Sequence, residues 1–411
     1  MAEDEPSRTV RLVLCSGTGG VLGALEPFPV DEPWWPEVAE IVTHAEQRFG
    51  IQIVVLRLLT ADASRSMEGG DVTYLAELVG DPPAELGLEP VDPGEVGPDD
   101  PLRMTWARPG GVEATLAWAD GCLRALGRPR TGPAVQVKSW NLSLLLRLPT
   151  GTDTVWSKSV PRFMGHEGAI LATVGAVSPD MVPALLASDP ATQTVLMEGV
   201  PGEDLFDAEL PQLLEMVARL VTLQVGFADR TDELLAAGLP DWRAKAFARA
   251  ATALVGRDDV RSELDGGTLD ALDALVAELP RRLADLAACG LPDTLVHGDF
   301  HPGNWRSGTG RPVLVDWGDS GVGHPLFDMP AFLTRIPPVD LERVKDTWID
   351  AWRDARPGSD PQRAAELIAP VAALRQALIY RTFLDHIEES ERVYHRTDPA
   401  DWLREAVTAA G

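Results

Sequence analysis

The first eighty residues alternate between short apolar runs and one amphipathic stretch. Apolar runs rich in β-branched residues, typical of buried strands, occupy residues 10–14, 51–59 and 72–78. Between the first two runs, apolar side chains recur on one face of a helix predicted over residues 34–49, which Gly50 would end. The pattern therefore predicts a small α/β domain over residues 1–80.

Residues 81–133 differ in composition, because proline, glycine and acidic residues dominate their first part. Such a composition does not bury a core and is typical of a linker or a long loop. One short helix is predicted over residues 112–126, and a second run rich in glycine and proline follows it. We place a domain boundary within this segment.

The pattern of the next segment, residues 134–200, predicts an antiparallel sheet. Strand patterns at residues 142–148 and 154–160 are joined by the turn sequence Pro-Thr-Gly-Thr-Asp. A helix is predicted to begin at Gly165, and a further strand at residues 195–197 runs into a connector of glycine and proline.

From residue 201 onward the apolar pattern is helical. Apolar side chains recur at intervals of three and four in several long stretches, which predicts buried helix faces. The predicted helices cover residues 210–227, 242–255, 269–288 (kinked at Pro280), 338–355 and 364–392 (divided near Pro370).

Two apolar runs within this helical region end in polar residues that carry chemistry. The first leads into His297-Gly298-Asp299 and, after a Pro-Gly turn, into Asn304; the second delivers Asp316. A carboxylate beside a hydroxyl can act as a base, whereas an amide oxygen and a second carboxylate suit Mg²⁺. We predict that these side chains converge on one site.

The spacing His-x-Asp-x-x-x-x-Asn matches the catalytic loop of protein kinases. Together with Val315-Asp316-Trp317, it resembles the aminoglycoside phosphotransferase branch of the kinase-like superfamily, which phosphorylates small molecules. The resemblance implies an α+β, protein-kinase-like two-lobe fold, with an antiparallel-sheet N-lobe over residues 134–200 and a helical C-lobe over residues 201–411. The small α/β domain would precede it.

The resemblance also assigns roles to individual residues. Asp299 would be the catalytic base, and Asn304 and Asp316 would hold Mg²⁺ against the phosphates of ATP. Lys158, on a predicted strand, would hold the α- and β-phosphates, braced by Glu167 at the start of the next helix. The family's hinge would bind the nucleotide base through backbone groups of the segment that contains Met197, Glu198 and Val200.

Three alternatives stay open at this stage. The loop expected over the phosphates, residues 137–142, contains no glycine, and Trp140 could cover or obstruct them. The chain could therefore be a nucleotide- or ligand-binding pseudokinase with a regulatory role. The acceptor could be an aminoglycoside, or it could be a metabolite such as a sugar or an amino alcohol, because the catalytic motifs are common to all these kinases.

The N-terminal segment faintly resembles a Nudix hydrolase in its order of strand, helix ending at Phe49-Gly50-Ile51, and strand. The positions that carry metal-binding glutamates in that family hold Gln47 and Arg48 here. The resemblance would therefore imply a Nudix-like domain without catalytic activity.

Composition and charge add limits. The chain has 411 residues, 45% of them hydrophobic, and a formal net charge of −27. Such a charge disfavours nucleic acid and anionic membranes and attracts cationic small molecules, although solubility alone also accounts for it. Three scattered cysteines give no metal or disulfide pattern, and we expect a cytoplasmic protein without a signal peptide or membrane-spanning run.

Overall fold

The computed structural model describes residues 7–62, 67–83, 86–151, 153–308 and 310–411. Their contacts divide the chain into two compact units. Unit 1 comprises Met1–Gly165, Leu185–Gly199 and Leu384–Arg396, and unit 2 comprises His166–Ala184, Val200–Phe383 and Thr397–Gly411. The domain boundaries expected at residues 80, 133 and 200 stay a prediction, since the contacts group the chain differently.

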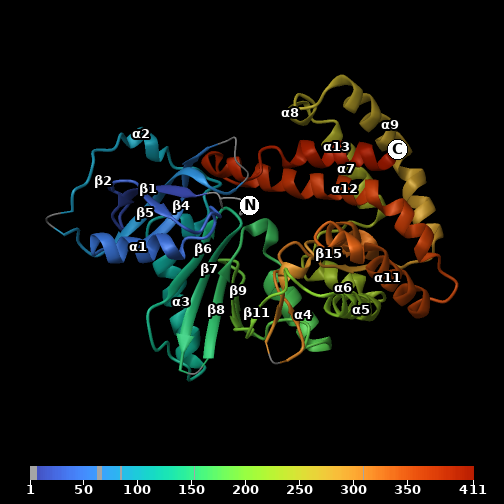
Figure 1. The fold of residues 1–411 in the computed structure, drawn as a ribbon, viewed down its shortest axis with the longest axis horizontal. Coiled ribbons are helices and arrows are strands. Elements are labelled where there is room, and N and C mark those ends of the chain that lie inside the picture. The colour runs from blue at the N-terminus through green and yellow to red at the C-terminus, as the bar shows by residue number, and fades with distance from the viewer. Residues whose placement is uncertain (1–6, 63–66, 84–85, 152, 309) are drawn as a thin grey trace. The chain divides into compact units, whose positions relative to one another are not determined.

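The first sheet of unit 1 has the order β2-β1-β5-β4, with β3 paired to β1. Strands β1 and β5 are parallel and the other pairs antiparallel, and α1 packs on this sheet through Ile41 and Ala45 (Figure 1). The elements are β1 (Arg8–Cys15), β2 (Val21–Ala24), β3 (Phe28–Val30), α1 (Ala39–Phe49), β4 (Gln52–Ala61) and β5 (Gly70–Val79).

Helix α1 ends where the sequence predicts, because Gly50 adopts the left-handed conformation with a φ of 66°. Its start is later than predicted, at Ala39 instead of residue 34. The indole of Trp35 is fully buried and donates a hydrogen bond of 2.9 Å to the Gly69 carbonyl oxygen. Residues before Ala39 are therefore held by the sheet's core and not by helical hydrogen bonds.

The segment expected as a linker contains α2 (Pro93–Val96), the 3₁₀ turn η1 (Thr105–Ala107) and α3 (Gly111–Ala125). Its described first part is largely exposed, in agreement with its composition. From Trp106 onward it contributes to a core, in which Trp106, Val112 and Leu123 are buried. The periodic apolar face of α3 accounts for this difference from a flexible linker.

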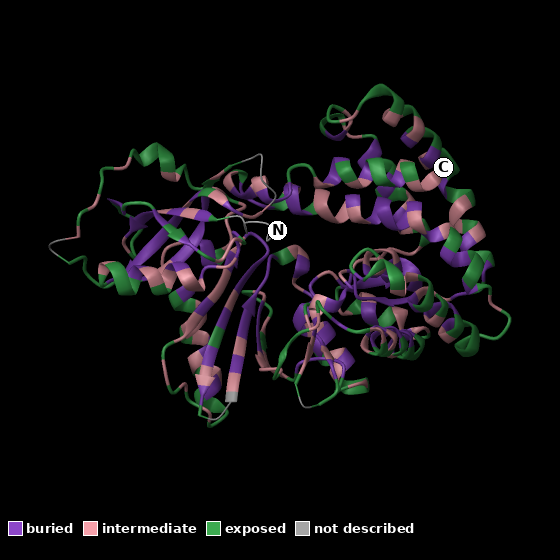
Figure 2. Cartoon of the chain, in the orientation of Figure 1, coloured by how far each residue is buried: buried purple, intermediate pink, exposed green. Residues whose placement is uncertain are grey.

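The second sheet of unit 1 is antiparallel, with the order β6-β7-β8-β10-β9. Its buried residues Leu144, Leu146 and Leu196 belong to the same core as α3, and buried positions alternate with less buried ones along most of β7 (Figure 2). The strands are β6 (Val135–Trp140), β7 (Ser143–Thr150), β8 (Asp153–Ser159), β9 (Leu185–Asp189) and β10 (Thr194–Glu198).

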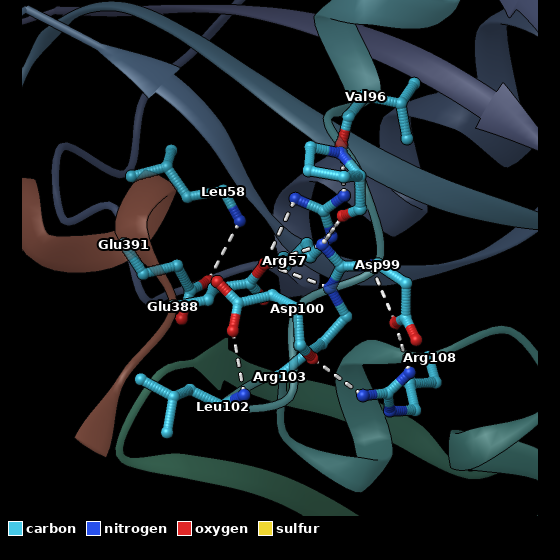
Figure 3. Close-up of polar contacts among 11 residues, drawn as sticks. Arg57, Leu58, Val96, Asp99, Asp100, Leu102, Arg103, Arg108, Glu388 and Glu391 are labelled. Atoms are coloured by element: carbon cyan, nitrogen blue, oxygen red, sulfur yellow. Dashed lines mark hydrogen bonds and ion pairs between the residues drawn. The ribbon is translucent and has the colours of Figure 1, made fainter.

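A segment from near the C-terminus, Leu384–Arg396, completes unit 1. The ring of Tyr394 lies 5.9 Å from that of Trp35 and 5.6 Å from that of Trp140. In the same segment, the Glu388 carboxylate lies 3.6 Å from Arg57, and Glu391 accepts a hydrogen bond from the Leu58 N–H, within a buried polar cluster (Figure 3). No periodic sequence pattern indicates that this segment packs in unit 1, and this packing was not predicted.

Unit 2 is mostly helical, as predicted. Its longer helices are α4 (Glu167–Val177), α5 (Leu210–Phe227), α7 (Ala244–Val255), α9 (Gly266–Ala288), α11 (Leu341–Ala355), α13 (Asp398–Ala410) and most of α12 (Pro361–His386). Its shorter elements are α6 (Thr231–Ala236), α8 (Asp258–Arg261), α10 (Met329–Leu333), β11 (Glu203–Asp204), β12 (Thr294–Val296), β13 (Trp305–Ser307), β14 (Val313–Leu314) and β15 (Gly321–Gly323).

Helix α12 differs from its prediction at two points. It is continuous through Pro370 and ends at His386, six residues before the predicted end. Proline removes one backbone donor, but burial of Val371, Leu374 and neighbouring residues compensates by packing. By length and composition α12 could cross a membrane, yet 56% of its most apolar window is buried in the protein, so this is weak evidence.

Candidate functional site

The candidate site is built on two short strand pairs of unit 2. Strand β12 pairs with β15 and ends at Val296, directly before the His297-Gly298-Asp299 loop. Strand β13 pairs with β14, and the Val315 N–H donates to the Asn304 carbonyl oxygen at 2.8 Å. This last hydrogen bond brings the chain that carries Asp316 beside Asn304.

Asp299 and Asn304 are in direct contact, as the sequence predicts. The Asn304 side-chain N–H₂ group donates to the Asp299 carbonyl oxygen at 2.8 Å and to its carboxylate at 3.0 Å. The 3₁₀ turn η3 (Pro302–Asn304) produces this return of the chain. Because the amide nitrogen is used, the Oδ1 atom of Asn304 is the atom left to accept a cation.

Asp316 follows β14 and is exposed. Its φ of 64° places a non-glycine residue in the left-handed region, which costs free energy and recurs at functional sites. Next to it, Trp317 is fully buried and its indole donates to the Leu314 carbonyl oxygen at 2.9 Å. The buried Trp317 side chain anchors the turn, while the adjacent Asp316 remains exposed to solvent.

These donors fit Mg²⁺ in type and number. One amide oxygen and one carboxylate are hard oxygen ligands, and Mg²⁺ usually takes one or two protein carboxylates together with substrate phosphates and water. Within the described ranges, no group of three or more His, Cys, Asp and Glu side chains could hold a metal by itself. A metal held by Asn304 and Asp316 would therefore depend on phosphate ligands.

Two histidines brace the loop. The His301 ring accepts a hydrogen bond from the Gly303 N–H at 3.1 Å and lies 3.4 Å from the Asp299 carboxylate. The Nε2 atom of His297 donates to the Val315 carbonyl oxygen at 3.1 Å. Burial lowers the pKa of His297 to about 4, so its ring is neutral near pH 7.

Asp299 is a carboxylate of low basicity. Desolvation raises the pKa of Asp299. The hydrogen bond and charge of His301, the charge of His297 and the Asn304 hydrogen bond together outweigh this effect and lower the pKa to about 2. About 45% of its side chain remains exposed. Asp299 is therefore ionised at every physiological pH and open to a hydroxyl group.

Asp328, at the end of the 3₁₀ turn η4 (Pro325–Asp328), ties the loop down from inside. Its carboxylate accepts hydrogen bonds from the N–H groups of His297 at 3.0 Å and Gly298 at 2.8 Å. It fixes the backbone that immediately precedes Asp299.

Gly298 is required by its surroundings. Its φ is 96°, and a Cβ atom there would lie 1.9 Å from the Asp319 carbonyl oxygen. We expect Gly298→Ala to lower the free energy of unfolding by roughly 2–5 kcal/mol through strain and overpacking. Gly226→Ala is the matched control, because a Cβ in this part of α5 meets nothing within 4 Å. Urea titrations showing equal stability for the two variants would contradict this assignment.

The other predicted residues are divided between the units: Lys158, Met197 and Glu198 belong to unit 1, and Glu167 and Val200 belong to unit 2. Lys158 lies on β8 opposite Leu145 and Val195 and is 8% exposed. Glu167 begins α4 in unit 2 and is buried. Since the two residues belong to different units, their pairing stays a prediction.

The expected hinge follows β10. Met197 is paired with Trp156 within the sheet, and the Glu198 carboxylate is bound by both terminal nitrogens of Arg128, one of them at 3.0 Å. The Gly199 N–H donates to the Thr154 carbonyl oxygen at 2.8 Å. Val200 is therefore the next residue along the chain that could offer its backbone to a nucleotide base.

Trp140 does not project freely from its loop. Its indole donates to the Ser143 hydroxyl at 2.9 Å, and its ring packs against Tyr394 and His395. The side chain is thus held by packing within unit 1.

Sequence reasoning missed Phe206 and Arg128. Phe206 is 56% exposed, its ring lies 5.6 Å from that of His301, and it fills the space that a Cβ on Gly303 would need. An exposed aromatic beside the candidate base is suited to contact an acceptor. Neither residue lies in a motif, and only the fold brings them to these positions.

Comparisons with known proteins agree with this geometry. A sequence model of the phosphotransferase enzyme family matches residues 123–367. Among solved structures, choline kinase LicA from Streptococcus pneumoniae is 15% identical, with a TM-score of 0.52 over 72% of this chain and 98% of that one. Macrolide 2'-phosphotransferase type I is 17% identical, with a TM-score of 0.50 over 70% and 97% of the two chains. Both likenesses show a shared kinase-like fold.

Two results of the comparisons are negative. No curated protein matches the chain. The family match begins at residue 123, and nothing in the comparisons supports the faint Nudix resemblance of the N-terminal segment.

Proposed function

Since this chain belongs to the phosphotransferase enzyme family and is a kinase with an alcohol group as acceptor, we propose that its phosphoryl donor is ATP with Mg²⁺. The acceptor would be a hydroxyl of an aminoglycoside or an amino alcohol, which are cationic, or of a sugar, which is not. The observation that carries the proposal is the hydrogen bond between Asn304 and Asp299, which gives the base and the candidate metal ligand one shared geometry.

Asp299 would orient the acceptor hydroxyl and take its proton. A carboxylate with a pKa of about 2 removes little of the proton before the new P–O bond forms, so its main contribution is orientation. Phosphoryl transfer with a loose transition state needs positioning and charge stabilisation more than a strong base.

Asn304 and Asp316 would hold Mg²⁺ through Oδ1 and the carboxylate. The ion, when bound, neutralises charge on the β- and γ-phosphates. Lys158 would contact the α- and β-phosphates with Glu167 as its brace, and the backbone near Val200 would meet the base. Met197 and Glu198 would support that strand end from within the sheet.

Acidic residues support a cationic acceptor. A surface cavity of unit 2 is lined by Glu203, Asp204, Asp207 and Glu209, and also by Arg306 from the strand that follows Asn304. Phe206 lies in the same chain segment. A protein with a net charge of −27 would also concentrate cationic solutes near its surface.

The test is Mg²⁺-dependent consumption of ATP across a panel of aminoglycosides, sugars and amino alcohols, with EDTA and with GTP as matched comparisons. We expect turnover with at least one acceptor and loss of turnover with EDTA. Nucleotide binding without phosphorylation of any acceptor would favour a ligand-binding pseudokinase. Absence of nucleotide binding would contradict the proposal.

A further inference from the structure

Arg375 of α12 is fully buried beneath the candidate catalytic loop. Its Nη1 atom donates to the Gly298 carbonyl oxygen at 3.4 Å, and a Cβ atom on Gly298 would lie 2.8 Å from its Nη2 atom. The guanidinium stacks on the Trp242 ring at 3.8 Å and lies 5.7 Å from the Phe327 ring. The proposed phosphoryl transfer assigns no role to this group.

Few hydrogen bonds hold this buried cation. In the part of the chain that the structure describes, its Nε and Nη2 atoms have no hydrogen-bond partner. Burial lowers the pKa of Arg375 to about 10, which leaves it charged near neutral pH, and the carboxylates of Asp328, Asp319 and Asp299 raise it in opposition. Burying such a cation costs free energy unless nearby negative charge compensates for it. The carboxylates are therefore the main groups that stabilise the buried guanidinium.

Asp328 is the carboxylate that this charge affects most. It is 1% exposed, and its acceptors already serve the N–H groups of His297 and Gly298 and the amide of Gln224 at 3.3 Å. Burial raises the pKa of Asp328 to about 6, Asp299 raises it slightly, and Arg375 and the two N–H groups lower it. Without the guanidinium, burial would favour the protonated acid, which accepts hydrogen bonds more weakly.

We propose that Arg375 is a positioning residue for the catalytic loop, which supplies the positive charge that compensates the buried Asp328 carboxylate and holds the Gly298 carbonyl oxygen, so that Asp299 is presented in one orientation. Arg375 acts through these two neighbours and touches neither substrate nor nucleotide. The catalytic role of the loop rests on the proposed function, whereas the contacts of Arg375 with the loop do not.

The experiment measures hydrogen exchange of the loop amides at His297 and Gly298, which needs no substrate. We expect Arg375→Met to speed their exchange by roughly tenfold or more, the factor that loss of a charge-assisted hydrogen bond brings. Arg381→Met is the matched control, because Arg381 lies on the same helix and pairs with Asp259 at 3.3 Å. Equal exchange at the loop in the two variants would overturn the proposal.

A double-mutant cycle separates positioning from general packing. If Arg375 acts partly through Asp328, Arg375→Met should add less than its full effect to the loop exchange of Asp328→Asn, whereas a packing role would give additive effects. Additivity would therefore overturn the proposal.

Should Arg375→Met not fold, Arg375→Lys gives the same answer. A buried lysine loses its charge at lower pH than a guanidinium, so loop protection in this variant should disappear with rising pH before that of the wild type. The same pH dependence in both proteins would overturn the proposal. If the Arg375 variants change loop exchange as expected but the wild type phosphorylates no acceptor, the result would count against the proposed function alone.

Discussion

Asp299→Asn is expected to lower turnover by roughly a thousandfold while leaving nucleotide binding close to that of the wild type. The amide has almost the same shape, but it cannot take a proton, and its N–H₂ group would face the Asn304 side chain that now donates to Asp299. Loss of a positioned base typically costs 10²–10⁴-fold, and the lost orientation adds to it.

The matched control is Asp293→Asn, which removes a carboxylate just before β12 at a position outside the candidate site. Turnover is measured with the acceptor that the panel identifies, and nucleotide affinity by calorimetry. A kcat for Asp299→Asn within a few fold of that for Asp293→Asn would remove Asp299 from the mechanism. Loss of nucleotide binding in the variant would mean that it disturbs the loop as a whole.

Sequence alone predicts the site where the motif is local. Asp299 and Asn304 are five residues apart and a single Pro-Gly turn joins them, so their contact follows from spacing. Helices with one apolar face, such as α5, were placed at their observed bounds for the same reason.

What the sequence does not predict depends on long-range packing. Arg375 lies 77 residues after Gly298 in the sequence. Its sequence position predicts only that it belongs to a long helix and does not indicate its partner. Phe206 reaches Gly303 across a similar distance in the chain. Contacts of this kind arise from tertiary structure, and neither composition nor periodicity encodes them in a readable form.

The segment Leu384–Arg396 is a further example, because a helical pattern was predicted for it up to residue 392. The structure ends α12 at His386 and uses the following 3₁₀ turn η6 (Glu389–Tyr394) to place Glu391 in the core of unit 1. Glu388 and Glu391 lie in a polar stretch of sequence, which would suggest that they are exposed to solvent. Their burial is decided by Arg57 and Arg103, which come from the other end of the chain (Figure 3).

Glu391→Gln is expected to remove a pH dependence of stability from unit 1. The wild-type carboxyl group is 2% exposed and accepts a hydrogen bond from the Leu58 N–H at 3.0 Å. Burial, and next the charge of Glu388, raise its pKa from 4.5 to about 8, although Leu58, Arg57 and Arg103 oppose the shift. The folded protein therefore keeps a proton here that the unfolded chain releases.

The sign follows from this difference in bound protons. Stability from the protonated group is fully present below about pH 4.5 and is lost as pH rises toward about 8, by up to about 1.4 kcal/mol per pH unit. The glutamine side chain cannot ionise. The free energy of unfolding of the variant should therefore increase relative to that of the wild type as pH rises across this interval. Glu389→Gln, an exposed neighbour in the same turn, should change nothing comparable.

Urea titrations at several pH values between about 5 and 8 measure this difference. A parallel pH dependence for the wild type and Glu391→Gln would show that Glu391 is ionised in the folded protein. The cluster would then be two carboxylates compensating two guanidinium groups, since Glu388 lies 2.9 Å from Arg103 and 3.6 Å from Arg57. Diverging stabilities would show that Glu388 alone carries the negative charge, and that Glu391 is held as a neutral hydrogen-bonding group against Leu58.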